Sequence, residues 1–262
     1  VSTGCVPGKS IKERAELLIN EGFFNIELTG GTQYYENYID DLLQLKKNNS
    51  NINFIVHNYF PPPKEPFVVN LGSLNKDVIS KSLNLCKSAI QDAVKLNSDR
   101  YSFHAGFYFD PKIKELGSIL DNRSLADSKL SQSTFIENVS ILKDFSSHYG
   151  VKLFIENNVV NIGSFLSFQK EIPAMLLNFA DYKKLLSQIE FNLLLDVAHL
   201  KVSINSLDLN YEEELFSLLD CSDYLHISDN NDLKDENKEI TKNSNLFKLL
   251  KNKDLRKKIM TL

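Results

Sequence analysis

Cysteine is scarce in this sequence, and long apolar runs are missing. The 262 residues include three cysteines, at positions 5, 86 and 221, which lack the spacing of a metal site. Their odd number argues against a disulfide framework. No segment has the apolar length that a bilayer span needs, and residues 1–4 carry no basic or apolar leader. These absences predict a cytoplasmic protein with reduced cysteines.

An excess of positive charge is missing too. The chain has 30 lysines and arginines against 34 aspartates and glutamates, and its basic residues are scattered except between Lys248 and Lys258. A protein that binds a nucleic-acid duplex usually presents a basic surface, which this pattern does not predict. The composition favours a small-molecule substrate over nucleic acid or a membrane, and it is compatible with a homo-oligomer.

The chain does have enough apolar residues for one large core. With 42% hydrophobic and 24% charged residues, positions 1–262 can fold as a single domain, because α/β barrels routinely reach this size.

Strand-like and helix-like runs alternate along the chain. The predicted strands are 1–3, 24–28, 52–56, 101–103, 151–155, 191–195, 224–227 and 258–262. Capping boxes at Ser10–Glu13 and Thr134–Glu137 predict the starts of two of the intervening helices. The alternation predicts a (β/α)8 TIM barrel, whose chemistry lies at the carboxyl ends of its strands. An open doubly wound sheet is the alternative, but it would gather ligands at one switch point.

Residues 4–10 resemble a phosphate-binding loop only superficially. That motif needs four residues between its glycines, whereas three separate Gly4 from Gly8, and one of them is Pro7. Proline has no amide proton to offer a phosphate. We interpret the segment as a strand-to-helix turn in which Ser10 caps the helix.

Ionisable residues end five of the predicted strands: His57, His104, Glu156, Asp196 and His226. Such groups are rarely buried without partners, so we expect one polar cluster at one face of a parallel sheet. The carboxylates of Glu156 and Asp196 and the imidazole of His226 form a mixed oxygen and nitrogen set that suits one divalent ion, Mn²⁺, Zn²⁺, Co²⁺ or Mg²⁺.

The residues around these strand ends resemble those of the xylose isomerase-like TIM barrels. The matching motifs are His57-Asn58, Phe103-His104-Ala105-Gly106, Ile155-Glu156-Asn157-Asn158, Leu195-Asp196-Val197-Ala198-His199 and Leu225-His226-Ile227-Ser228-Asp229. The superfamily includes isomerases and epimerases of sugars and sugar phosphates as well as endonuclease IV. The Asp-x-x-His and His-x-x-Asp pair, in this order after Glu-Asn, is specific for the superfamily and says little about the substrate.

The resemblance implies a metal-dependent isomerase or epimerase of a small sugar or sugar phosphate. Glu156, Asp196 and His226 would be the metal ligands, and Glu156 would also transfer a proton through a metal-bound enediolate. His199 would bind a substrate oxygen. A second glutamate ligand would end strand eight, so we expect the natural chain to continue past Leu262 with that glutamate and the last helix of the barrel.

The remaining assignments leave alternatives open. We assign His57, His104 and Asp229 to substrate binding, although the two histidines could equally line and order the barrel mouth. In members that resemble endonuclease IV, His57 and His104 would bind further zinc ions, as would an aspartate and a histidine after His226. Here Asn237 replaces that histidine. An endonuclease IV-like phosphodiesterase is therefore the alternative, together with a non-catalytic binding protein on the same scaffold.

Overall fold

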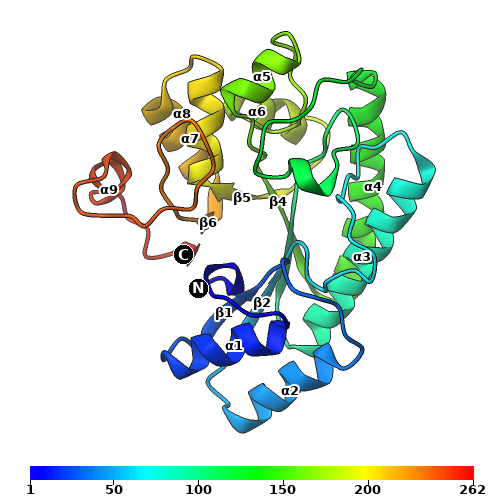
Figure 1. The fold of residues 1–262 in the computed structure, drawn as a ribbon, viewed down its shortest axis with the longest axis vertical. Helices are drawn as coiled ribbons and strands as arrows, with labels where there is room; N and C mark the ends of the chain where they lie inside the picture. Colours follow the sequence, from blue (N-terminus) through cyan, green and yellow to red (C-terminus); the bar gives the residue numbers. More distant parts are fainter. The chain divides into compact units, whose positions relative to one another are not determined.

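The computed structural model describes residues 1–262, in which strands and helices alternate (Figure 1). The strands are β1 (Asn25–Leu28), β2 (Asn53–His57), β3 (Arg100–His104), β4 (Lys152–Glu156), β5 (Asn192–Asp196), β6 (Ser222–His226) and β7 (Ile259–Thr261). The α-helices are α1 (Ile11–Asn20), α2 (Tyr38–Asn48), α3 (Lys76–Lys95), α4 (Ser128–His148), α5 (Ile162–Ser167), α6 (Phe179–Leu186), α7 (Val197–Ser206), α8 (Tyr211–Leu219) and α9 (Asn245–Leu250). Two 3-10 turns are η1 (Thr3–Cys5) and η2 (Ile113–Glu115).

The seven strands form one sheet in the sequential order β1-β2-β3-β4-β5-β6-β7. Strand β1 pairs in parallel with β2, and β5 pairs in parallel with β6, where Asp196 lies opposite His226. A doubly wound sheet reverses its strand order at a switch point, whereas a (β/α)8 barrel keeps the order of the chain. The predicted α/β TIM-barrel class is confirmed.

The first predicted strand is reduced to a single bridge. Ser2 pairs in parallel with Glu27, and the amide of Glu27 donates to the carbonyl of Val1 at 2.9 Å. The chain then turns into η1, because the side chain of Ser2 accepts a hydrogen bond from the amide of Gly4 at 3.1 Å. The last predicted strand, 258–262, corresponds to β7.

The residues group into two compact units. Unit 1 comprises 1–67, 80–103 and 138–154, and unit 2 comprises 68–79, 104–137 and 155–262. All of the predicted site residues except His57 belong to unit 2.

The core of unit 1 lies between β1, β2 and α1. Helix α1 turns one apolar face to the core, since Ile11, Ala15 and Leu18 are all buried. The helix contacts β1, and the side chains of Ile26 and Phe54 on the neighbouring strands are buried as well. Burying one large apolar side chain contributes about 1.5–3 kcal/mol, so these contacts fix the helix against the strands.

Unit 2 has an aromatic-rich cluster beside its βα loops. It consists of Val68, Phe107, Phe109, Leu120, Val160, Phe168, Ala174 and Leu177. Most of these residues come from the segments that follow β3 and β4, so the cluster packs together loops that leave the strand ends. It gives the loops around the candidate site an apolar support.

The two predicted capping boxes have different outcomes. The first is confirmed: Ser10 Oγ accepts from the amide of Glu13, and Glu13 Oε2 accepts from the amide of Ser10, both at 3.2 Å. The second is wrong, because Thr134 lies inside α4, which begins at Ser128. Asp127 caps that helix instead, with its Oδ1 accepting from the amide of Leu130 at 2.8 Å.

Helix α7 follows β5 directly and was not expected from the sequence. Asp196 is both the last residue of β5 and the N-cap of α7. The helix therefore carries His199 in its first turn, next to the strand end. No helix in the described chain combines the length and apolar character of a membrane span.

Candidate metal centre

Three successive strands of the sheet end in the residues predicted to bind metal. Glu156 ends β4, Asp196 ends β5 and His226 ends β6. His226 Nδ1 lies 3.2 Å from Glu156 Oε1 and 3.8 Å from Asp196 Oδ2. Glu156 is 1% exposed and Asp196 5% exposed, so these donor atoms converge in a buried place.

Asn157 fixes the spacing between the two carboxylates. Its Oδ1 accepts from the amide of Asp196 at 2.7 Å, and its Nδ2 donates to the carbonyl of Asp196 at 3.0 Å. Asn157 directly follows Glu156, so one buried side-chain amide joins the end of β4 to the end of β5. The sequence motif Glu-Asn contains this clamp, although our sequence analysis gave Asn157 no separate role.

The two oxygens of Asp196 have different surroundings. Oδ1 accepts hydrogen bonds from the amides of Ala198 and His199, both at 2.8 Å. These bonds satisfy two of the amides that a helix leaves unpaired at its start. Oδ2 faces His226 instead and is the oxygen in position to bind a metal ion.

Three imidazoles surround the carboxylate of Glu156. His104 Nδ1 lies 3.3 Å from Oε2, while His226 Nδ1 and His199 Nδ1 lie 3.2 and 3.6 Å from Oε1. The rings of His104 and His199 are also neighbours, with centroids 5.6 Å apart. The structure thus brings together four of the predicted histidine and glutamate positions in unit 2.

Both ring nitrogens of His199 have partners. Nδ1 lies 3.0 Å from the carbonyl oxygen of Asn157, which can only accept, so Nδ1 donates this hydrogen bond. Nε2 lies 3.2 Å from Asp235 Oδ2. Burial alone would lower the pKa of His199, but Asp196, Asp235 and Glu156 together raise that pKa well above its usual value.

The pKa values of two acidic partners of His199, Asp196 and Asp235, are shifted in opposite directions. Burial raises the pKa of Asp196 and Glu156 adds to the effect, while His199 and His226 oppose it. Burial would also raise the pKa of Asp235, but its contact with His199 lowers that pKa below the usual value. When two carboxylates are buried side by side, a bound cation relieves the repulsion between them.

These donors fit a divalent cation. The ligand atoms of Glu156, Asp196 and His199 lie within 4.8 Å of one another, and His226 Nδ1 faces the same carboxylates. Of the two imidazoles, His226 turns Nδ1 to both carboxylates, whereas Nδ1 of His199 donates to a carbonyl and Nε2 faces Asp235. The mixed set of carboxylate oxygens and imidazole suits Mn²⁺, Zn²⁺, Co²⁺ or Mg²⁺.

Asp229, which we predicted to bind substrate, takes part in an ion pair. Its Oδ1 accepts from Lys201 Nζ at 2.8 Å and from the amide of Asn230 at 2.9 Å. Its backbone forms an antiparallel bridge with Lys238, through hydrogen bonds of 2.8 and 2.7 Å. In this structure Asp229 fastens the two ends of the segment 229–238 together.

His57 lies in unit 1, at the end of β2. It is 5% exposed, and its Nδ1 lies 2.9 Å from Ser102 Oγ. The side-chain amide of the next residue, Asn58, is buried and has no hydrogen-bond partner. Substrate binding by His57 stays a prediction.

Asp235 is the residue of this site that the sequence analysis did not assign to the proposed enzyme. In the sequence, only the resemblance to endonuclease IV pointed to the loop that contains Asp235. Asn237, in the same loop, has a left-handed backbone (φ 47°), and its Oδ1 accepts a hydrogen bond from Ser228 Oγ at 3.2 Å. The amide oxygen that replaces the histidine of endonuclease IV thus has a local partner in the loop.

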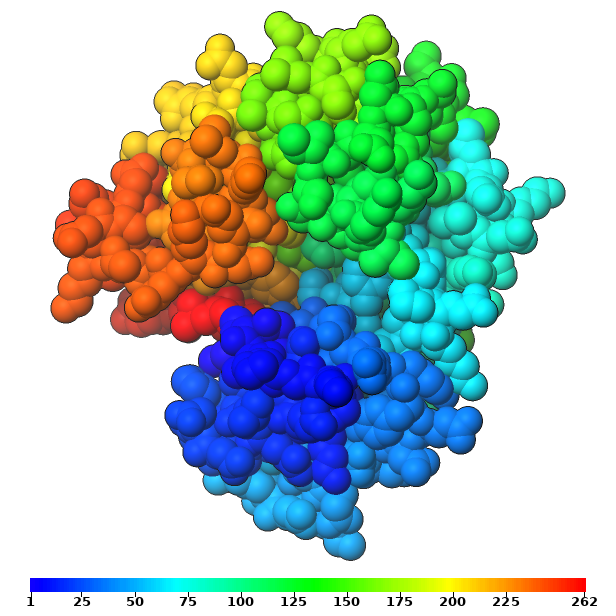
Figure 2. Space-filling view, in the orientation of Figure 1, coloured from blue at the N-terminus to red at the C-terminus, as the bar shows by residue number.

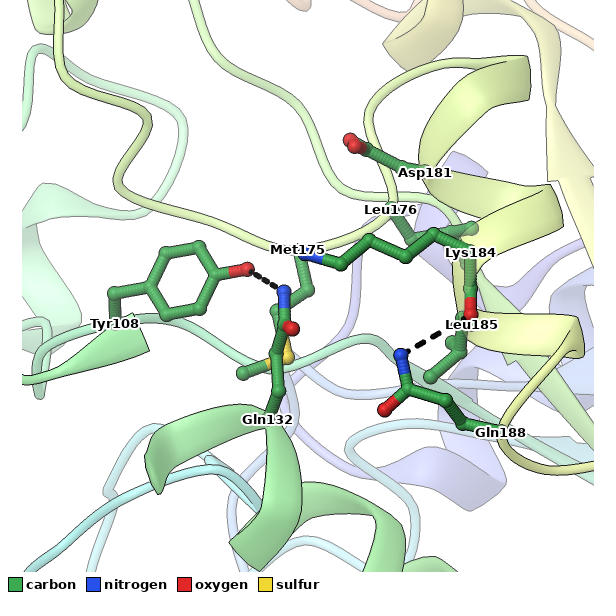
Figure 3. A pocket seen from close by; sticks show the side chains of 8 residues that line it. All are labelled: Tyr108, Gln132, Met175, Leu176, Asp181, Lys184, Leu185 and Gln188. Atoms are coloured by element: carbon green, nitrogen blue, oxygen red, sulfur yellow. Dashed lines mark hydrogen bonds between the residues drawn. The ribbon is translucent and has the colours of Figure 1, made fainter. Parts of the chain in front are cut away.

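A separate pocket lies elsewhere in unit 2 (Figure 3). It is lined by Tyr108, Gln132, Met175, Leu176, Asp181, Lys184, Leu185 and Gln188. Gln132 Nε2 donates to the hydroxyl of Tyr108 at 2.6 Å, and Gln188 Nε2 donates to the carbonyl of Lys184 at 3.2 Å. None of its lining residues belongs to the predicted site.

Comparison with known families agrees with the fold. Residues 16–259 match the family model of the xylose isomerase-like TIM barrel. Because this match covers most of the 262 residues, the chain belongs to that family. No curated protein sequence matches the chain.

Solved structures with the same fold include sugar epimerases and an endonuclease. A D-tagatose 3-epimerase-like protein superposes with a TM-score of 0.73 at 19% identity, covering 99% of this chain and 87% of its own. The apo form of 3-keto-D-glucoside 4-epimerase from E. coli has a TM-score of 0.64 at 12% identity, covering 97% and 86%. Endonuclease IV from Thermus thermophilus has a TM-score of 0.58 at 13% identity, covering 99% and 88%. At these identities the likeness shows the fold alone.

Proposed function

We propose that this member of the xylose isomerase-like TIM barrel family is a divalent-metal-dependent isomerase or epimerase. Its substrate would be a small sugar or sugar phosphate with a carbonyl beside a hydroxyl group. One observation carries the proposal: donor atoms of Glu156, Asp196 and His226 converge at the ends of three successive strands. Barrels of this kind place their chemistry at these ends.

Glu156, Asp196 and His226 would hold the cation in this proposal. A bound divalent ion polarises a carbonyl and an adjoining hydroxyl, which lowers the cost of removing the proton between them by several kcal/mol. Asp196 offers Oδ2, because Oδ1 is engaged by the start of α7. His226 offers Nδ1, the nitrogen that faces both carboxylates.

Glu156 is the proton-transfer residue that we propose. Its Oε1 faces His226 and His199, whereas Oε2 lies on the side of His104, 3.3 Å from Nδ1. Oε2 is therefore the oxygen that would take the proton from the carbon next to the carbonyl and return it.

His199 would orient a substrate oxygen. Its Nδ1 is held by the carbonyl of Asn157 and its Nε2 faces Asp235, so the ring is fixed, and a substrate oxygen would share the Nε2–H with that carboxylate. The helix start that Asp196 caps keeps the backbone of His199 next to the cluster. A donor fixed in this way loses little entropy when the substrate binds.

The named epimerases among the structural neighbours support sugar chemistry on this fold, at the level of an analogy. Endonuclease IV has the same fold, so phosphodiester cleavage is the alternative outcome of the test. The site residue Asn237 weighs against it, because an amide oxygen is a weak zinc ligand compared with imidazole.

Two measurements test the proposal. Elemental analysis should find one divalent metal per chain in the wild-type protein and a loss of metal in Glu156→Ala, Asp196→Ala and His226→Ala. Incubation of the metal-loaded protein in heavy water with ketoses such as D-tagatose, and with sugar phosphates, should place deuterium on the carbon next to the carbonyl. Glu156→Gln should abolish this exchange.

The matched control is His148→Ala, which removes an exposed histidine at the end of α4. It should leave both metal content and exchange unchanged. Unchanged metal content in all three site variants would refute the metal centre. Cleavage of abasic-site DNA without sugar turnover would favour the phosphodiesterase.

A further inference from the structure

The segment between β6 and α9 brings a third carboxylate to the candidate site. This segment, residues 227–244, is drawn in orange and forms part of the outer surface (Figure 2). Within it Asp235 turns inward, and its side chain is only 15% exposed. Its Oδ2 lies 3.2 Å from Nε2 of His199, the nitrogen through which that ring would address a substrate.

The other oxygen of Asp235 has no hydrogen-bond partner. Oδ1 is buried and accepts no hydrogen bond in the structure. A buried carboxylate oxygen without a donor is unfavourable, so a ligand that brings a donor to this oxygen is stabilised by it. His199 and Asp235 together thus offer an Nε2–H that Asp235 Oδ2 already engages and one open acceptor, Asp235 Oδ1.

The ion pair of Lys201 holds this segment in place. Lys201 Nζ donates to Asp229 Oδ1 at 2.8 Å and to the carbonyl of Asn230 at 2.9 Å, and it pairs with Asp232 Oδ1 at 2.6 Å. The backbone bridge between Asp229 and Lys238 closes the segment on its other side. Asp235 lies between these two attachments, so the loop that carries its carboxylate is anchored on both sides.

Charge decides which groups can bind beside the contact between His199 and Asp235. A divalent cation would offset the two carboxylates of Glu156 and Asp196, which leaves Asp235 as the remaining negative charge facing His199. A hydroxyl group beside this contact can share the Nε2–H and donate to the open Oδ1 of Asp235 at the same time. A phosphate or carboxylate group brings negative charge, and like charges placed side by side repel each other.

We propose that Asp235 is a specificity-determining residue, which together with His199 selects a substrate hydroxyl and excludes an anionic group at this position. The proposal deepens the proposed function and rests on it for the identity of the ligand. Exclusion of the anion follows from the charge of Asp235 and needs no reaction, so it can be measured without turnover.

The first experiment uses inorganic phosphate as the probe. The full chain, loaded with Mg²⁺ and labelled with ¹⁵N in its histidines, is titrated with phosphate at fixed pH while the ring signals of His199 are followed by NMR. His199→Gln identifies these signals. Phosphate should affect His199 only weakly in the wild type, and Asp235→Asn should bind it about tenfold more tightly or more.

The matched control is Glu236→Gln, which neutralises the adjacent residue. Glu236 pairs with Lys238 at the surface, so this variant should bind phosphate like the wild type. Equal affinities in the wild type and Asp235→Asn would overturn the proposal. An absence of any phosphate-dependent shift in both proteins would overturn it too, because neutralising Asp235 would then open no anion site.

The second experiment tests the hydroxyl. With a sugar that the wild type converts, Asp235→Ala should raise KM about tenfold, whereas Glu236→Gln should not change it. An unchanged KM in Asp235→Ala would refute hydroxyl recognition. If no sugar reacts while the phosphate titration gives the expected difference, the proposed function fails and the exclusion of anions by Asp235 stands.

Discussion

The carboxylate of Asp196 binds the backbone amide of His199 at 2.8 Å. The Asp-x-x-His motif is therefore the first turn of a helix as well as part of the candidate site. One oxygen of Asp196 stabilises α7, and the other faces the proposed cation. Because each oxygen has its own role, mutation can separate helix capping from the proposed metal binding.

Asp196→Asn should keep the helix cap and lose metal, whereas Asp196→Ala should lose both. Asparagine caps helices as well as aspartate does, and replacing either by alanine costs about 0.5–2 kcal/mol. Urea unfolding of the metal-free proteins should rank Asp196→Ala below Asp196→Asn in the free energy of unfolding. Equal stability of the two variants would show that the cap contributes nothing.

Lys201→Met should destabilise the protein by about 3 kcal/mol, because it leaves the buried Asp229 without its cation. The side chains of Lys201 and Asp229 are each 12% exposed. Lys238→Met breaks the exposed pair with Glu236 in the same segment and should cost less than about 1 kcal/mol. Urea unfolding measures both, and similar values for the two variants would contradict this account of Lys201.

Asp181→Asn should stabilise the protein at neutral pH. Burial raises the pKa of Asp181 above its ordinary value of 3.8, so the folded state binds its proton more tightly than the unfolded state does. The resulting destabilisation is complete above the raised pKa and disappears as the pH falls towards 3.8. Thermal unfolding should therefore show a gain for Asp181→Asn at pH 7 that shrinks in acid, and a pH-independent difference would refute it.

Cys86 should resist thiol reagents in the folded protein. Burial raises the pKa of its thiol to about 12, and the hydroxyl of Tyr101 donates to its sulfur at 3.4 Å. Cys5 and Cys221 are exposed. Titration with a coloured disulfide reagent should detect both exposed thiols quickly and the third only after denaturation. Rapid reaction of Cys86, identified by mass spectrometry, would contradict its burial.

The sequence pattern located the strand ends well because strand runs and the residues that terminate them are local features. Glu156, Asp196 and His226 could be grouped in advance, since consecutive parallel strands of a barrel end at one face. The capping box predicted at Thr134–Glu137 was wrong because such a pattern can also occur inside a helix. Nothing in these four residues shows that Asp127 already caps the helix.

Asp235 and α7 could not be found in the same way. The contact between His199 and Asp235 joins positions 36 residues apart and depends on how the β6–α9 segment folds back. Helix α7 has apolar residues on several faces because most of it is buried, so its sequence lacks the periodicity of a surface helix. Tertiary contacts rather than local preference determine both features.

The side-chain amide of Asn157 pairs with the backbone of Asp196 as a peptide group of a neighbouring strand would. It accepts from the amide and donates to the carbonyl of the same residue, and so adds one further rung beyond the end of β4. Buried groups at the strand ends consequently align the two carboxylates. Sequence drift in those loops can change what the barrel recognises while the distance between its acidic residues is preserved.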